Sequence, residues 1–264
     1  MPSISHPTSA PSSIRLLAVF AVLFIAYQLP EGLGARILHS MPVAATLMLL
    51  FLPVAWLCGR ALGWRGLDAW YMQRSTGWAM LLAACFALAV LAKLGALAAG
   101  SALGVYEVRF ATDKDGQAWL LAALGMLPFT FVPSVAEDIV TRGFLMRALP
   151  SLGQRPEFIA ASALVYVLNH IYRLSNGPVE WLMLFCFGLA YAAALYYSRS
   201  LWPAIGLHWG WNFAGQFMDQ VGSVDGNGNG PFVSMAAHLM MLAAVVLVAR
   251  MVGQPAVRRQ ALGS

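Results

Sequence analysis

The sequence predicts an all-α membrane protein, a polytopic bundle of about eight transmembrane helices with both termini in the cytoplasm. Three observations lead to this prediction. The composition is 60% hydrophobic and only 10% charged, whereas soluble domains carry about 25% charged residues. Apolar runs of about 17 to 25 residues, long enough to cross a bilayer as a helix, recur along the chain. Lysine and arginine are concentrated in alternate loops, as membrane topology requires.

Eight apolar runs are expected to form the spans, and the fourth is expected to continue as a helix to about residue 148. Pro128 and Pro133 predict a kink in that fourth run. Lys93, within the third run, is expected to face the bundle or to reach toward the membrane surface. The runs lie near 15–34, 40–59, 76–99, 117–136, 156–173, 179–198, 201–220 and 232–252.

The basic residues indicate the orientation. Eleven of the 16 lysines and arginines lie on the side of the N-terminus, four lie on the opposite side, and Lys93 lies within a span. This bias supports an even number of spans. The membrane domain then covers 15–252, between a disordered cytoplasmic tail at 1–14 and a short basic cytoplasmic tail at 253–264. No basic stripe with interleaved aromatic residues occurs, so we expect the lipid bilayer, and no nucleic acid, as a partner.

The helix that follows Pro133 (PSVAEDIVTRGF) carries charges that are costly in a membrane, about 3 kcal/mol each on insertion scales. Asp138 and Arg142 are four residues apart and can pair on one helix face. Glu137 is turned away by about 100°. A carboxylate left without a cation in a low-dielectric setting suits a general base. The alternative is a polar network of all three residues that only holds the bundle together.

Two later stretches add polar side chains at similar depth. In YVLNH, His170 lies thirteen residues after the start of its helix at Glu157, while Glu137 lies twelve residues before Leu149. At about 1.5 Å per residue the two side chains should face each other across a helical hairpin, and Tyr166 lies one turn from His170.

In HWGWN, His208 and Asn212 are four residues apart and share one helix face. Both side chains are too polar to face lipid, so we expect them to point into the bundle.

A glutamate, two histidines and an asparagine that converge in a membrane indicate hydrolysis. Glu137, helped by His170, would activate a water, and His208 with Asn212 would donate to the developing oxyanion, at about 3–4 kcal/mol per donor. A second version places Glu137, His170 and His208 as ligands of a zinc ion. No cofactor is certain, and neither a GxSxG elbow nor an HExxH motif occurs.

In this order, EDIVTRG, YVLNH and LWPAIGLHWGWN resemble the three motifs of the CAAX-protease and bacteriocin-processing (CPBP) family of intramembrane proteases. That family includes the Ras-converting CAAX prenyl endopeptidase (type II). The similarity covers about 118–220, the expected catalytic core. It implies Glu137 as catalytic acid/base, His170 as its partner, and His208 with Asn212 as oxyanion contacts.

The resemblance also implies CAAX-type processing of a membrane protein or peptide in a bacterial-type plasma membrane. The family is described as metalloproteases, and a glutamate-activated water without metal has also been proposed for it. This chain departs from the pattern at two positions, with Asp138 where a second Glu is usual and Tyr166 in place of Phe. Asp138 can still pair with Arg142.

Two other functions stay open. The chain could be a catalytically silent scaffold or immunity-type protein of the same family. It could also be a proton-coupled transporter in which Glu137, His170 and His208 form a relay. Transporters usually show inverted repeats, and no internal symmetry is evident in this sequence.

Overall fold

The computed structural model describes residues 11–112 and 115–252 of the chain. Within these residues the fold is helical apart from one short pair of strands, which confirms the predicted all-α class. Two of the helical segments, η1 and η3, are π-helices, and η2 and η4 are 3-10 helices. In chain order the elements are α1 (Ser13–Leu29), η1 (Pro30–Ile37), α2 (Met41–Ala61), η2 (Gly66–Trp70), α3 (Trp78–Ala102), β1 (Tyr106–Phe110), α4 (Gly116–Asp138), η3 (Ile139–Gly143), α5 (Phe144–Ala148), α6 (Pro150–Gly153), α7 (Glu157–Asn169), η4 (Ile171–Asn176), α8 (Pro178–Ser198), α9 (Leu201–Val221), β2 (Gly222–Gly226) and α10 (Gly230–Val252).

The predicted tails fall mainly on residues that the structure does not describe. The basic tail at 253–264 lies wholly outside the described residues. So do the first ten positions of the tail expected at 1–14, and α1 already begins at Ser13.

Each of the eight predicted runs contains a helix, and six helical units of the described chain are long and apolar enough to cross a membrane. These six are α1 with η1, α2, α3, α4 with η3 and α5, α8, and α10. Helix α7, at 13 residues, is shorter than the roughly 20 residues that a span needs. The apolar run expected to reach residue 173 therefore stops as an α-helix at Asn169, and a 3-10 turn follows.

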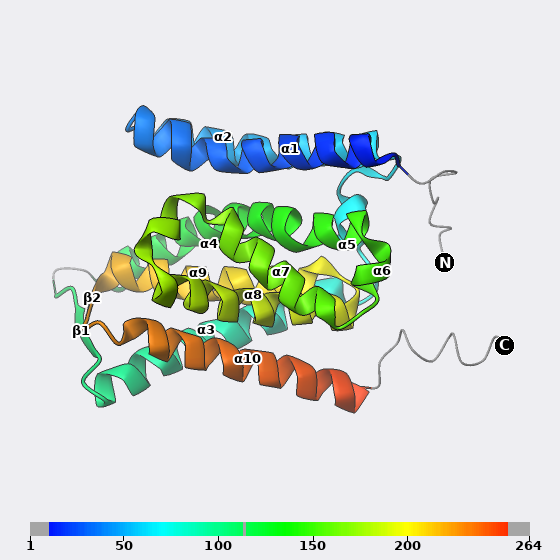
Figure 1. The fold of residues 1–264 in the computed structure, drawn as a ribbon. Coiled ribbons are helices and arrows are strands. Elements are labelled where there is room, and N and C mark those ends of the chain that lie inside the picture. Colours follow the sequence, from blue (N-terminus) through cyan, green and yellow to red (C-terminus); the bar gives the residue numbers. More distant parts are fainter. Residues whose placement is uncertain (1–10, 113–114, 253–264) are drawn as a thin grey trace.

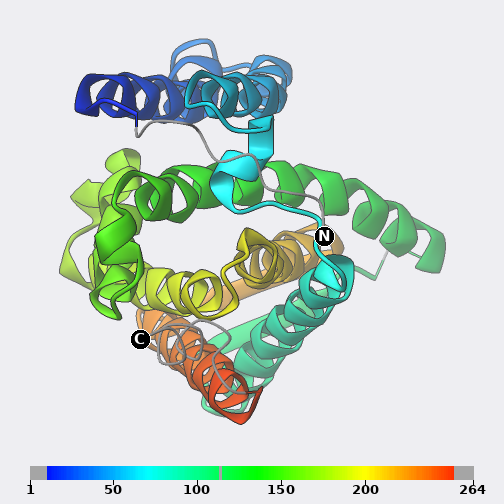
Figure 2. The ribbon, with the colours of Figure 1, turned by 90° about the vertical axis from the view of Figure 1, so that its right-hand side faces the viewer.

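The helices form layers around α9 (Figures 1 and 2). Helices α1 and α2 make an outer layer on one side, next to α4. Helices α3 and α10 lie on the opposite side, and α9 packs against α3, α4 and α8. The start of α1 and the end of α10 lie at the same end of the bundle (Figure 1), which fits an even number of crossings.

Helix α9 is buried along most of its length because glycines let α3 approach it closely. A methyl group at Gly206 would meet the Leu82 carbonyl oxygen, and one at Gly210 would meet the Phe86 carbonyl oxygen. The polar face of α9 is therefore held in the interior of the bundle, as the sequence predicts for His208.

Lys93 faces the bundle, which is one of the two predicted alternatives, and its ammonium group lies 4.7 Å from the centroid of the Trp211 ring.

A short antiparallel pair, β1 with β2, was not predicted from the sequence. It joins the end of α3 to the end of α9, and Tyr106 pairs with Gly226 in its register. The Tyr106 hydroxyl also donates to the carbonyl of Gly230 at 2.8 Å. The pair lies at the end of the bundle opposite the described chain ends (Figure 1).

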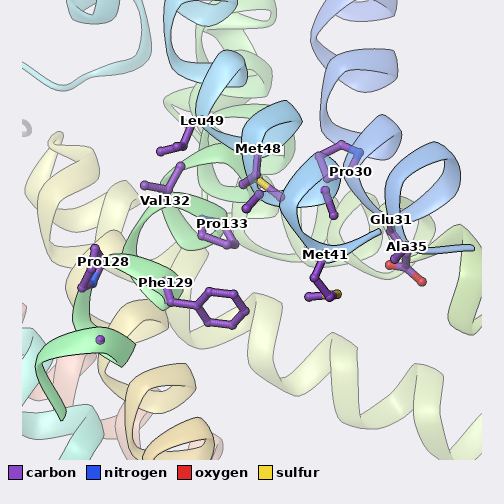
Figure 3. A pocket seen from close by; sticks show the side chains of 13 residues that line it. Pro30, Glu31, Ala35, Met41, Met48, Leu49, Pro128, Phe129, Val132 and Pro133 are labelled. Carbon is purple, nitrogen blue, oxygen red and sulfur yellow. The ribbon is translucent and has the colours of Figure 1, made fainter. Parts of the chain in front are cut away.

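An apolar groove of about 490 Å³ separates the α1–α2 layer from α4 (Figure 3). Met41, Met48, Phe129 and Pro133 are among the residues that line it, and Glu31 is its charged member. Pro133 lies four residues before Glu137, so the groove runs beside the helix that carries the candidate site.

Candidate active site

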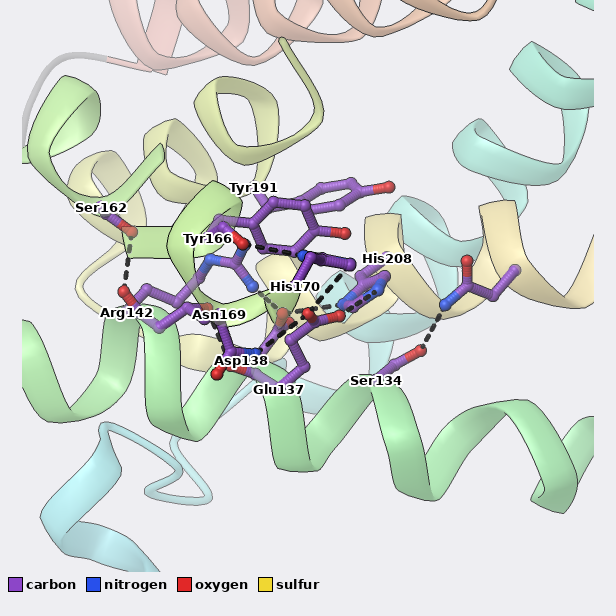
Figure 4. A network of polar contacts seen from close by, with 12 residues as sticks. Ser134, Glu137, Asp138, Arg142, Ser162, Tyr166, Asn169, His170, Tyr191 and His208 are labelled. Carbon is purple, nitrogen blue, oxygen red and sulfur yellow. Dashed lines mark hydrogen bonds and ion pairs between the residues drawn. The ribbon is translucent and has the colours of Figure 1, made fainter. Parts of the chain in front are cut away.

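Glu137 lies at the centre of a buried polar cluster built from three separate helices (Figure 4). Its Oε1 atom is 3.4 Å from His170 Nε2, at the end of α7, and its Oε2 atom is 3.3 Å from His208 Nε2, on α9. Asn169 Nδ2 donates a further hydrogen bond to Oε1 at 3.3 Å. The structure therefore brings together three of the four residues predicted to be catalytic.

The partners of the two histidines show which ring nitrogen carries a proton. His170 Nδ1 lies 2.8 Å from the carbonyl oxygen of Tyr166, and His208 Nδ1 lies 2.9 Å from Asp138 Oδ1. A carbonyl and an ionised carboxylate only accept hydrogen bonds, so both Nδ1 atoms donate. Each histidine thus presents Nε2 to Glu137. A direct hydrogen bond at either contact needs a proton between nitrogen and oxygen.

Asp138 has two partners, one of which the sequence predicted. The carboxylate forms the expected ion pair with Arg142 four residues on, and both side chains are fully buried. The same Oδ1 atom also accepts from His208. Asp138 therefore orients a histidine of the cluster as well as balancing Arg142.

Arg142 is enclosed by aromatic rings. Its guanidinium carbon lies 5.1 Å from the centroid of Tyr166 and 5.3 Å from that of Tyr191. Such cation–π contacts stabilise a desolvated guanidinium by about 2 kcal/mol. The Tyr166 ring also meets the His170 ring edge-on at 4.7 Å, so the residue that replaces the usual phenylalanine keeps an aromatic contact with the histidine.

His208 is supported by a second histidine–tyrosine pair, which consists of Tyr191 on α8 and His238 on α10. The Tyr191 ring stacks on the His208 ring, with centroids 4.9 Å apart and planes at 20°. The Tyr191 hydroxyl lies 2.9 Å from His238 Nε2, and His238 Nδ1 lies 2.9 Å from the carbonyl of Ser234. Because that carbonyl only accepts, His238 Nδ1 carries the proton and Nε2 accepts from Tyr191.

Asn212 lies one helical turn beyond His208, and its amide donates to Ser134 Oγ at 3.3 Å. Ser134 is on α4, three residues before Glu137. The amide is thus fixed next to the cluster, and its role as an oxyanion contact remains a prediction.

The backbone beneath Glu137 changes from α-helix to π-helix. Helix α4 ends at Asp138, and η3 covers Ile139–Gly143. The Thr141 hydroxyl donates to the carbonyl of Glu137 at 2.7 Å, and the Ser134 hydroxyl donates to the carbonyl of Thr130 at 2.8 Å. Side-chain donors therefore reach backbone carbonyls near Pro133 and at the start of the π-turn. Such π-turns occur often at functional sites.

The zinc version of the site is not supported. Among residues 11–112 and 115–252, no group of three or more His, Cys, Asp or Glu side chains is arranged so that it could hold a metal ion. Glu137, His170 and His208 face one another, but they do not form a group that could hold a metal ion. The chemistry below is therefore derived from the side chains and a water.

The sequence reasoning missed several polar residues that surround the cluster, Ser134 among them. Asn169 stands within the YVLNH stretch, and Tyr191 lies on α8. Gln28 and His238 are single polar residues within apolar runs, and the cost of such residues in a membrane helix was the available signal.

Comparison with known proteins agrees with the geometry. The helical bundle and its glutamate–histidine cluster identify the chain as a polytopic membrane protein with a buried polar site. The family model described as Type II CAAX prenyl endopeptidase Rce1-like matches residues 117–214, which include all three motifs. Through this segment, which covers less than half of the chain, the protein is similar to that family. No curated protein matches the chain.

Proposed function

We propose that this chain is an intramembrane endopeptidase that hydrolyses a peptide bond with a water activated by Glu137. The observation that carries the proposal is the placement of the Glu137 carboxylate between the Nε2 atoms of His170 and His208, at 3.4 and 3.3 Å. A carboxylate and two imidazoles at this separation can accept, hold and return a proton.

In the proposed reaction, a water attacks the carbonyl carbon of the scissile peptide bond while its proton passes to Glu137. The proton taken up by Glu137 passes on to His208 Nε2, 3.3 Å away, and the imidazolium so formed donates to the tetrahedral oxyanion together with the Asn212 amide until the proton returns to Glu137. Asp138, bound to His208 Nδ1 at 2.9 Å, stabilises that imidazolium. Collapse of the intermediate breaks the C–N bond, and Glu137 returns the proton to the leaving amine, giving one carboxylic acid and one amine.

His170 is the most exposed of the three side chains that meet at Glu137. The side chain of His170 is 13% exposed, against 6% for Glu137 and 3% for His208. This order supports His170 as the residue that assists Glu137 with the incoming water. It also supports His208 as the drier oxyanion contact, where low dielectric strengthens hydrogen bonds to developing charge.

The proposed substrate is a membrane protein or peptide, processed in the manner of CAAX proteins, in a bacterial-type plasma membrane. The description of the matched family as a CAAX prenyl endopeptidase supports this substrate class. The domain limits proposed for the enzyme are a membrane domain over 15–252 with the catalytic core at about 118–220.

The test compares membrane proteomes of cells that carry the wild type, Glu137→Gln or Glu180→Gln. Glu180 is a matched control because it is a glutamate in an ion pair, with Arg173, on a membrane helix away from the cluster. We expect a precursor to accumulate with Glu137→Gln and not with Glu180→Gln. Identical proteomes in all three would favour the scaffold, and proton-coupled uptake by reconstituted vesicles would favour the transporter.

A further inference from the structure

The first helix reaches the candidate site although it lies outside the matched segment 117–214. Gln28, near the end of α1, is a polar side chain that is only 9% exposed. Its Nε2 atom donates to the backbone carbonyl of Asn169 at 2.8 Å and lies 3.3 Å from Asn169 Oδ1. A buried amide costs free energy unless such partners satisfy it.

The contact with Oδ1 determines which end of the Asn169 amide faces Glu137. With Oδ1 facing a donor on Gln28, the amide presents its N–H groups to Glu137 Oε1, where Nδ2 lies at 3.3 Å. Without the donor, the amide could turn and place Oδ1 against the carboxylate, where two acceptors would repel each other.

The contact with the carbonyl holds the neighbouring histidine. The Asn169 carbonyl belongs to the peptide bond that joins Asn169 to His170, at the C-terminal end of α7. The last carbonyls of a helix lack partners within the helix, and Gln28 supplies one here. Asn169 and His170, which both contact Glu137 Oε1, are therefore anchored through one side chain of α1.

We propose that Gln28 is a positioning residue, which fixes the Asn169 amide and the Asn169–His170 peptide so that both residues face Glu137 Oε1. The proposal rests on the proposed hydrolytic function only for its effect on rate. Its structural content is a property of the resting protein and can be measured without turnover.

The experiment uses the full chain in lipid nanodiscs with ¹⁵N-labelled asparagine and histidine. The chain has five asparagines and five histidines, so the spectra are sparse, and Asn169→Ala and His170→Gln assign the two signals. We expect Gln28→Met to shift the Asn169 side-chain amide and the His170 ring signals. Gln73→Met is the matched control, since Gln73 Nε2 also donates to a backbone carbonyl, that of Asp68, at 2.8 Å. It should leave both signals in place.

A second variant, Gln28→Leu, guards against a folding defect of Gln28→Met. Unchanged Asn169 and His170 signals in a folded Gln28 variant would overturn the proposal. In cells, processing of the precursor that accumulates with Glu137→Gln should slow about tenfold to a hundredfold, the scale of a misplacement of about 1 Å. If no precursor accumulates with Glu137→Gln, the proposed function fails while the spectra still decide the role of Gln28.

Discussion

Replacement of Asp138 by asparagine should destabilise the protein strongly, because it removes the charge that balances Arg142. Both side chains are fully buried, and the pair is direct. Asparagine has nearly the same shape, so little packing is lost, and its Oδ1 can still accept from His208. What remains is a guanidinium without its counter-charge in the interior. Breaking a buried pair in this way costs about 3–5 kcal/mol, a large share of a typical free energy of unfolding of about 5–15 kcal/mol.

The assay is reversible unfolding in detergent micelles, with Glu31→Gln as the control. Glu31 pairs with Arg36 at 2.6 Å, but both side chains are about half exposed, at 49% and 52%. Loss of such an exposed pair should cost under about 1 kcal/mol. The double variant Asp138→Asn/Arg142→Met should recover most of the loss, because no unbalanced charge remains. An Asp138→Asn protein as stable as Glu31→Gln would refute the reasoning.

Two further predictions concern packing around the site. Tyr191→Phe removes the donor to His238 Nε2 and should lower the free energy of unfolding by about 1–3 kcal/mol; a second substitution, His238→Phe, should then add little, and fully additive losses would contradict the pairing. Gly210→Ala should cost about 1–3 kcal/mol, because the new methyl group meets the Phe86 carbonyl on α3. By contrast, Gly125→Ala, in α4 with open space around it, should gain up to about 1 kcal/mol in the same unfolding measurement.

The elements that depend on local pattern could be predicted from the sequence. The positions of the eight helices follow from apolar runs, and the pairing of Asp138 with Arg142 follows from a spacing of four on a helix. The facing of Glu137 and His170 follows from nearly equal distances, of twelve and thirteen residues, to the ends of a hairpin. The structure contains each of these arrangements.

The remainder depends on packing between segments that are distant in the chain. The contact of His208 with Asp138 joins residues 70 positions apart, and that of Gln28 with Asn169 joins residues 141 positions apart. No periodicity encodes such a pairing. The π-turn at η3 was also missed, because it depends on how the backbone adjusts to its neighbours. The same limit applies to the short α7, whose apolar run continues past the last α-helical residue.

Residues outside the matched segment also hold the polar cluster in place, because α1 and α10 contribute side chains that contact it. A fragment cut at residues 117 and 214 would lose the side chains of Gln28 and His238, although it would keep every residue of the three motifs. The motif residues would all be present, but Asn169 and Tyr191 would lack the hydrogen-bond partners that hold them in place. Among relatives, residue choice at position 28 should therefore change together with that at position 169, as expected for side chains in contact. The residue at position 238 should likewise change together with the residue at position 191.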